Sequence, residues 1–123
     1  MPASSIGWIL IVSGAFAAGG GLAGLISPKS ILQLVFGVKD ADGPLMFFTR
    51  HWGALLFVVC ALTVYTAYFP STRVPILTAS IVEKFVIVAL IFFGPLKRTV
   101  FMTILGALDG ILALIFIAYL ART

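Results

Sequence analysis

Four long apolar runs constrain this chain more than any other feature of its sequence. Prolines, glycines and charged residues separate the runs, which cover residues 6–26, 45–69, 75–93 and 99–119. Each has roughly the 20 residues that an α-helix needs to cross the hydrocarbon core of a bilayer. Of the 123 residues, 62% are hydrophobic and only 10% are charged, whereas about a quarter are charged in a soluble domain. The sequence therefore predicts a single all-α integral membrane domain, an antiparallel up-down bundle of four transmembrane helices.

Two further patterns refine this prediction. Segment 30–43 is too short and too polar to span a membrane, but it has an apolar side, so we expect a short interfacial helix between the first two spans. Gly20 with Gly24, and Gly106 with Gly110, form GxxxG pairs in the first and last spans. Such pairs let helix backbones approach closely in lipid, so these faces are predicted to meet another helix, which could belong to a partner protein.

The distribution of basic residues predicts an orientation. Because short connections make neighbouring spans antiparallel, segment 30–43 and residues 96–98 lie at one end of the bundle, here called the near side. The near side holds Lys29, Lys39, Lys97 and Arg98, and the far side holds Arg73 and Arg122. Trp8, Tyr65, Tyr68 and Tyr119 fall at the far side, as expected of an interfacial aromatic belt. The positive-inside rule then predicts that both termini are non-cytoplasmic, in the plasma membrane or the endoplasmic reticulum.

Four charged residues and the histidine lie inside the predicted spans: Arg50, His51, Glu83, Lys84 and Asp109. A charge at the bilayer centre costs about 2.5–3.5 kcal/mol on insertion scales, so such residues turn toward the bundle interior and pair. We expect them to form one polar site. Adjacent residues point about 100° apart around a helix, so we expect Glu83 to face Arg50 or Asp109. Lys84 would then lie at a helix interface or reach toward water.

This composition favours acid–base chemistry on a lipophilic molecule. A carboxylic acid kept neutral by burial and a carboxylate beside a cation can serve as general acid and general base. The predicted catalytic residues are Glu83, Asp109, Arg50 and His51, and the predicted substrate-binding residues are Lys84, Trp52, Phe57 and Ser80. If the protein is an enzyme, an isomerase, epoxide hydrolase or cyclase fits, because these reactions need no redox cofactor. The alternatives are a purely architectural ion pair, and an accessory or scaffold subunit of a larger membrane complex.

Other classes of site lack their motifs. The chain has one histidine and one cysteine, Cys60, with no CxxC, HExxH or GxGxxG pattern, so neither a metal site nor a bound cofactor is predicted. The net charge of +4 comes from scattered basic residues that form no stripe, so no nucleic-acid partner is expected. The predicted partners are the lipid bilayer, a small lipophilic molecule, and a second copy or another membrane protein.

The placement of several residues resembles the small four-span membrane proteins grouped as DoxX-like. The likeness covers most of the chain: a glycine-rich first span, Arg50 and Gly53 early in the second, Glu83 in the third and Asp109 in the fourth. The RHWG stretch is also similar to fungal sterol-pathway scaffold proteins of the same size. The resemblance implies the four-span fold and leaves the function open, and Lys84 matches no residue of either family.

Overall fold

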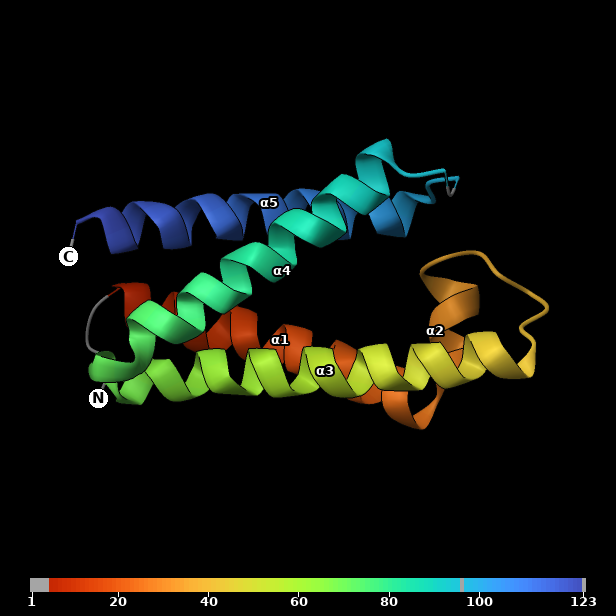
Figure 1. The fold of residues 1–123 in the computed structure, drawn as a ribbon, viewed down its shortest axis with the longest axis horizontal. Coiled ribbons are helices and arrows are strands. Elements are labelled where there is room, and N and C mark those ends of the chain that lie inside the picture. Colours follow the sequence, from red (N-terminus) through yellow and green to blue (C-terminus); the bar gives the residue numbers. More distant parts are fainter. Residues whose placement is uncertain (1–4, 96, 123) are drawn as a thin grey trace.

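The computed structural model describes residues 5–95 and 97–122 and consists of helices joined by short connections (Figure 1). The elements are α1 (Ser5–Ile26), α2 (Pro28–Leu34), α3 (Gly43–Tyr68), a 3-10 turn η1 (Pro70–Thr72), α4 (Arg73–Phe93) and α5 (Val100–Ala121). Among the described residues, four helices are long and apolar enough to cross a membrane: α1, α3, α4 with η1, and α5. The predicted four-span helical fold is confirmed, and each predicted end lies within two residues of the observed one.

Capping side chains explain where α3 and α5 begin. The Asp42 carboxylate accepts the backbone N–H of Leu45 at 2.8 Å, and Pro44 occupies the first turn of α3. Thr99 caps α5 in the same way by accepting the N–H of Met102 at 3.1 Å. These caps satisfy N–H groups that have no partner within a helix. The hydroxyl of Thr99 also donates to the carbonyl of Val35, which ties the start of α5 to the residue that follows α2.

The short helix differs from its predicted range of 30–43. Helix α2 begins two residues earlier, at Pro28, whose fixed φ suits the first turn of a helix. It ends at Leu34, and Gly37 then adopts a left-handed conformation with φ of 70°. A residue in that conformation stops a helix, and glycine adopts it at little cost. The chain between Val38 and Asp42 is therefore irregular rather than helical.

Helices α1 and α3 form the closest pair, and they do so through glycine. A Cβ on Gly21 would lie 2.7 Å from the Gly53 carbonyl oxygen, and a Cβ on Gly53 would lie 2.5 Å from the Gly21 carbonyl oxygen. Two helical turns earlier in α1, a Cβ on Gly14 would lie 2.8 Å from the carbonyl oxygen of Cys60. The contacts repeat every seven residues on both helices, which is the spacing of a left-handed pair. The backbones touch because side chains are missing from this seam.

The GxxxG pairs are only partly used as predicted. Gly24 packs against the ring of Trp52, but Gly20 is exposed, and a Cβ there would meet nothing within 4 Å. Gly106 faces the ring of Phe92, and Gly110 also faces α4. The faces of Gly24, Gly106 and Gly110 are thus occupied by helices of the same chain. The prediction that the GxxxG faces form a surface for a partner protein is wrong for these glycines.

The helices meet in two apolar clusters at opposite ends of the bundle. The cluster at the far side takes one fully or nearly fully buried residue from each long helix: Leu10, Ala67, Leu77 and Phe116. Toward the near side α4 diverges from α3 (Figure 1), and α2 fills the gap between the two pairs of helices. There Val35 packs with Ile91 of α4 and Met102 of α5. Helix α2 and the residues after it thus pack between α3 and the α4–α5 pair at the near side.

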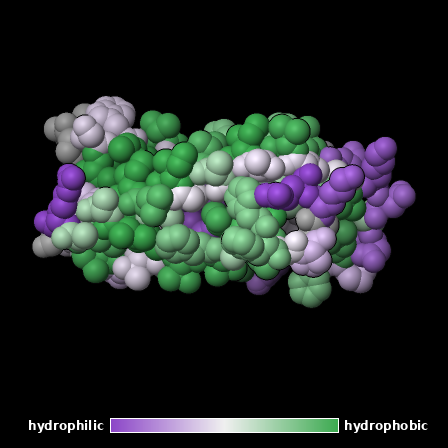
Figure 2. Space-filling model, turned by 90° about the horizontal axis from the view of Figure 1, so that it is seen from above, coloured by the Kyte–Doolittle hydropathy of each residue, from purple (hydrophilic) through white to green (hydrophobic). Residues whose placement is uncertain are grey.

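The outer surface matches a bilayer. Hydrophobic residues cover the middle of the molecule and hydrophilic ones gather at its two ends (Figure 2). The larger hydrophilic group lies at the near side, where α2 and the α4–α5 connection are found. Large apolar side chains such as Phe16, Phe93 and Leu114 are 63–87% exposed in the isolated chain, which suits contact with lipid.

Candidate functional site

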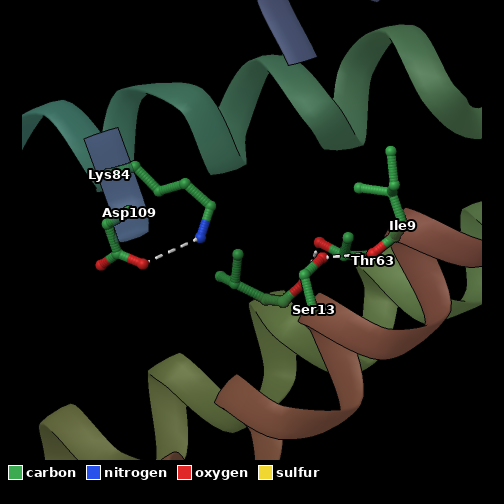
Figure 3. A network of polar contacts seen from close by, with 6 residues as sticks. Ile9, Ser13, Thr63, Lys84 and Asp109 are labelled. Atoms are coloured by element: carbon green, nitrogen blue, oxygen red, sulfur yellow. Dashed lines mark hydrogen bonds and ion pairs between the residues drawn. The ribbon is translucent and has the colours of Figure 1, made fainter. Parts of the chain in front are cut away.

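A buried ion pair joins the middles of α4 and α5. The ammonium of Lys84 lies 3.4 Å from Oδ1 of Asp109 and forms a hydrogen bond with it (Figure 3). The side chain of Lys84 is only 5% exposed, and that of Asp109 is 29% exposed. The Lys84 ammonium also lies 6.0 Å from the centre of the Phe116 ring. The pair therefore sits among apolar groups at the depth of the bilayer centre.

The pair opens onto a cavity of about 760 Å³, here called the lateral cavity. Helices α1 and α5 supply most of its walls, and α2, α3 and α4 supply the rest. The lining residues are Trp8, Ile9, Val12, Ser13, Phe16, Ala17, Gly20, Ile31, Val35, Phe36, Trp52, Leu56, Lys84, Ile87, Ile91, Phe101, Met102, Leu105, Leu108, Asp109, Ile111, Leu112 and Ile115. Exposed apolar residues of α1 and α5, among them Val12 and Ile111, form its rim, so it opens sideways toward lipid.

The lateral cavity has one polar level. Lys84 and Asp109 form one wall at this level, and Ser13 of α1 lies across from them (Figure 3). The Ser13 hydroxyl donates to the carbonyl of Ile9 at 2.6 Å, so its oxygen stays free to accept a hydrogen bond. All other lining side chains are hydrophobic apart from the indole N–H groups of the tryptophans. A ligand here meets polar atoms at one depth and hydrocarbon on either side.

The predicted substrate-binding residues divide into two groups. Trp52 and Lys84 line the lateral cavity, and Trp52 meets Phe36 edge to face with ring centres 6.2 Å apart. Phe57 is 37% exposed on the outer surface of α3, and Ser80 is buried on α4, and neither lines the cavity. The prediction of a ligand contact for Phe57 and Ser80 is not supported by their positions.

Arg50 and His51 do not join the buried pair. Both are exposed, and Nη1 of Arg50 donates to the carbonyl of Leu25 at 2.7 Å. The last carbonyls of a helix have no partner within it, and the long arginine side chain reaches one at the end of α1. The predicted convergence of Arg50 with Glu83 and Asp109 is therefore wrong.

Lys84, rather than Glu83, pairs with Asp109 of the neighbouring helix. The buried face of α4 runs through Leu77, Ser80, Lys84 and Ile91, and this helical spacing turns Lys84 inward. Glu83 is half-buried beside it and does not line the lateral cavity. Its Oε1 is buried and has no hydrogen-bond partner among the described residues. Lys84 thus lies at a helix interface, which is one of the two positions predicted for it, and there it is the partner of Asp109.

A second buried cation, Arg73, went unrecognised in the sequence. Its side chain donates to the carbonyls of Thr66 at 2.8 Å and Ala67 at 3.1 Å, and to the hydroxyl of Tyr119 at 2.9 Å. The guanidinium also lies 5.6 Å from the centre of the Tyr119 ring. Arg73 thus joins the end of α3, the start of α4 and the end of α5. A basic residue just after the Pro-Ser-Thr turn was the only signal, and it reads equally well as an exposed charge.

The described residues contain no group of three His, Cys, Asp or Glu side chains placed to hold a metal ion. The polar groups at the middle level of the lateral cavity are those of Ser13, Lys84 and Asp109, and they can hydrogen-bond to a ligand and exchange protons with it. Comparisons of the chain with models of protein families, with curated proteins and with solved structures give no match.

Proposed function

We propose that the protein binds a small lipophilic molecule in the lateral cavity and converts it by acid–base chemistry at Lys84 and Asp109. One observation carries the proposal: a buried ammonium, with one acceptor among the described residues, faces an apolar cavity. The volume of about 760 Å³ lies within the range of roughly 300–1,000 Å³ that is usual for small-molecule sites. The protein spans the membrane, so the molecule reaches the cavity through the bilayer, between α1 and α5.

The chemistry follows from the two groups of the ion pair. Lys84 carries protons that it can donate to an oxygen of the bound molecule, and Asp109 can accept a proton from carbon or from a hydroxyl group. Once Lys84 has given a proton and Asp109 has taken one, both are neutral. Return of that proton from Asp109 to Lys84 restores the ion pair. An isomerisation fits this cycle, because it needs one proton removed and one delivered.

Two neighbouring glycines give a matched test of binding. Gly19 and Gly20 are both exposed in α1, and a Cβ at either meets nothing within 4 Å, but only Gly20 lines the lateral cavity. We expect Gly20→Leu to remove a co-purifying lipophilic molecule that mass spectrometry detects with wild type and with Gly19→Leu. Equal recovery of the molecule from both variants would reject the lateral cavity as its site.

A separate comparison tests conversion. Asp109→Asn keeps the size and hydrogen-bonding capacity of the side chain but cannot take up a proton as a carboxylate does. In membranes with equal amounts of protein, we expect this variant to retain the bound molecule and to accumulate it relative to its product. If the ratio of the bound molecule to its product in lipid extracts is the same as for wild type, the proposed catalytic step is rejected and only the binding function remains.

The accessory-subunit alternative has lost the feature that suggested it, since most GxxxG glycines pack within the chain. Membership of the DoxX-like group stays a proposal that depends on the placement of Arg50, Glu83 and Asp109. This resemblance does not indicate which substrate the protein binds.

A further inference from the structure

We infer that the ligand of the lateral cavity is a neutral lipophile with one internal hydroxyl or carbonyl group and apolar carbon on both sides of it. The inference rests on the function proposed above and narrows it to a class of molecule. Three features of the site support this inference: the unused hydrogen-bond donors of Lys84, the zero net charge of the ion pair, and the depth of the ion pair along the helices.

Lys84 has hydrogen atoms to spare. An ammonium carries three N–H donors, and among the described residues only Oδ1 of Asp109 accepts one, at 3.4 Å. The nearby ring of Phe116 offers no lone pair. The side chain of Lys84 is 95% removed from solvent, so bulk water does not supply the missing acceptors. An oxygen atom of a ligand in the lateral cavity would supply one, and a hydroxyl group could in addition donate to Asp109.

The charge of the site selects a neutral ligand. The charges of Lys84 and Asp109 cancel each other, and the other described residues that line the cavity are uncharged. An ionised carboxylate or an ammonium would leave one uncompensated charge in hydrocarbon, which is strongly unfavourable. The half-buried Glu83 beside Lys84 brings no positive charge that could compensate an anion.

Depth fixes where the polar group lies in the ligand. The ion pair is near the middle of α4 and α5, roughly 14–18 Å along the helix from either end at 1.5 Å per residue. The headgroup of a phospholipid stays at the membrane surface and does not reach this level. The apolar lining continues past the pair in both directions, to Trp8 toward the far side and to Phe36 toward the near side. A ligand that fills the cavity therefore has its oxygen within the carbon skeleton.

Four probes with one skeleton can test this class. They are a symmetrical long-chain ketone, the secondary alcohol made from it, the alkane of the same length, and the acid with its carboxyl group on the same central carbon. The reporter is Trp52, which lines the cavity and becomes the only tryptophan when Trp8 is replaced by phenylalanine. A dibrominated alkane quenches it in nanodiscs, and each probe restores the fluorescence by displacing the quencher.

We expect the ketone and the alcohol to displace the quencher at concentrations about tenfold lower than the alkane, the gain from a hydrogen bond to a charged donor. The ionised acid should be no better than the alkane. In Lys84→Met the advantage of the ketone over the alkane should vanish, because a ketone can only accept a hydrogen bond, while the alkane binds as before. If the single variant does not fold, Lys84→Met with Asp109→Leu gives the same comparison without an unpaired carboxylate.

Two outcomes separate this inference from the proposed function. If the ionised acid matches or exceeds the ketone, or if the ketone keeps its advantage without Lys84, the inferred ligand class is wrong. The proposed binding site would still stand, provided that Gly20→Leu abolishes quenching and Gly19→Leu does not. If Gly20→Leu leaves quenching intact, the lateral cavity binds no lipophile and both conclusions fail.

Discussion

Lys84 shows that the register of a membrane helix, rather than the chemistry of a side chain, decides which of two adjacent charges turns inward. Glu83 and Lys84 are neighbours in an apolar run, and either could have faced Asp109. The buried face of α4 includes Ser80 and Lys84, so the lysine meets Asp109 and the glutamate lies to one side. The pair then depends on both partners, because neither has another ionic partner among the described residues.

Replacing Lys84 with methionine should lower the free energy of unfolding by about 3–5 kcal/mol, because Asp109 is left charged and unpaired. Lys84→Met combined with Asp109→Leu should recover most of this loss, since both charges are gone. Denaturant unfolding in mixed micelles of wild type, both single variants and the double variant measures the coupling. Losses that simply add would contradict a direct interaction.

Even a conservative substitution of Arg73 should destabilise the protein. In Arg73→Lys the positive charge remains, but one ammonium cannot reach the carbonyls of Thr66 and Ala67 and the hydroxyl of Tyr119 together. We expect a loss of about 2 kcal/mol in the free energy of unfolding, measured by thermal unfolding in detergent. Arg122→Lys is the control, because Arg122 is exposed at the same end of the bundle. Equal stability of the two variants would show that the Arg73 contacts contribute nothing.

The sequence predicts which residues are charged within the spans but not how they pair. Composition placed Glu83, Lys84 and Asp109 at the right depth, because an apolar run of fixed length has a defined middle. It did not predict the partner of Arg50, because the reach of an arginine side chain and the free carbonyl of Leu25 decide that contact. Pairing depends on rotation about each helix axis, which the packing of several helices sets together.

At the level of helices, the pair α1–α3 contrasts with the pair α4–α5. In the first pair, Gly14, Gly21 and Gly53 each let the backbone of one helix touch the backbone of the other. Side chains mediate most of the second pair, including the contact of Gly106 with Phe92 and the ion pair of Lys84 with Asp109. The glycine content of the first span predicted a close approach, but the GxxxG rule selected Gly20, which the seven-residue spacing of the true seam excludes.

A single methyl group should disturb this seam. Gly21→Ala would place its Cβ 2.6 Å from the backbone nitrogen of Phe57, so α1 and α3 must move apart. We expect a loss of about 1–3 kcal/mol in the free energy of unfolding, the usual cost of overpacking. Gly20→Ala, one residue away with open space around it, should keep or raise stability because alanine favours the helix. Thermal unfolding of the two variants checks the contrast, and equal melting temperatures would rule out the seam.

At the scale of the whole molecule, the distribution of charge predicts how the protein sits in its membrane. The near side carries more exposed basic residues than the far side, where Arg73 is buried in the bundle. The four-span fold, its bounds and the ends at which the connections lie follow from the sequence, because hydropathy and the positions of proline and charge define them. The lateral cavity cannot be predicted from the sequence, because it depends on how far α4 diverges from α3.

The orientation can be tested with single cysteines. In a Cys60→Ala background, Lys39→Cys reports the near side and Ser71→Cys the far side, and both positions are exposed. We expect an impermeant maleimide to label Ser71→Cys but not Lys39→Cys from the non-cytoplasmic face, in agreement with the positive-inside rule. Inside-out vesicles should give the reverse pattern. Labelling of Lys39→Cys alone from the non-cytoplasmic face would invert the predicted topology.

Because the lateral cavity opens between α1 and α5 toward lipid, the ligand concentration that sets its occupancy is the concentration in the membrane. A molecule that enters from the bilayer is sampled according to its mole fraction among lipids, not its amount in water. Adding more lipid at a constant amount of ligand should therefore weaken occupancy, as dilution does in solution. Partitioning then acts as a first filter, which admits only compounds that already dissolve in the membrane.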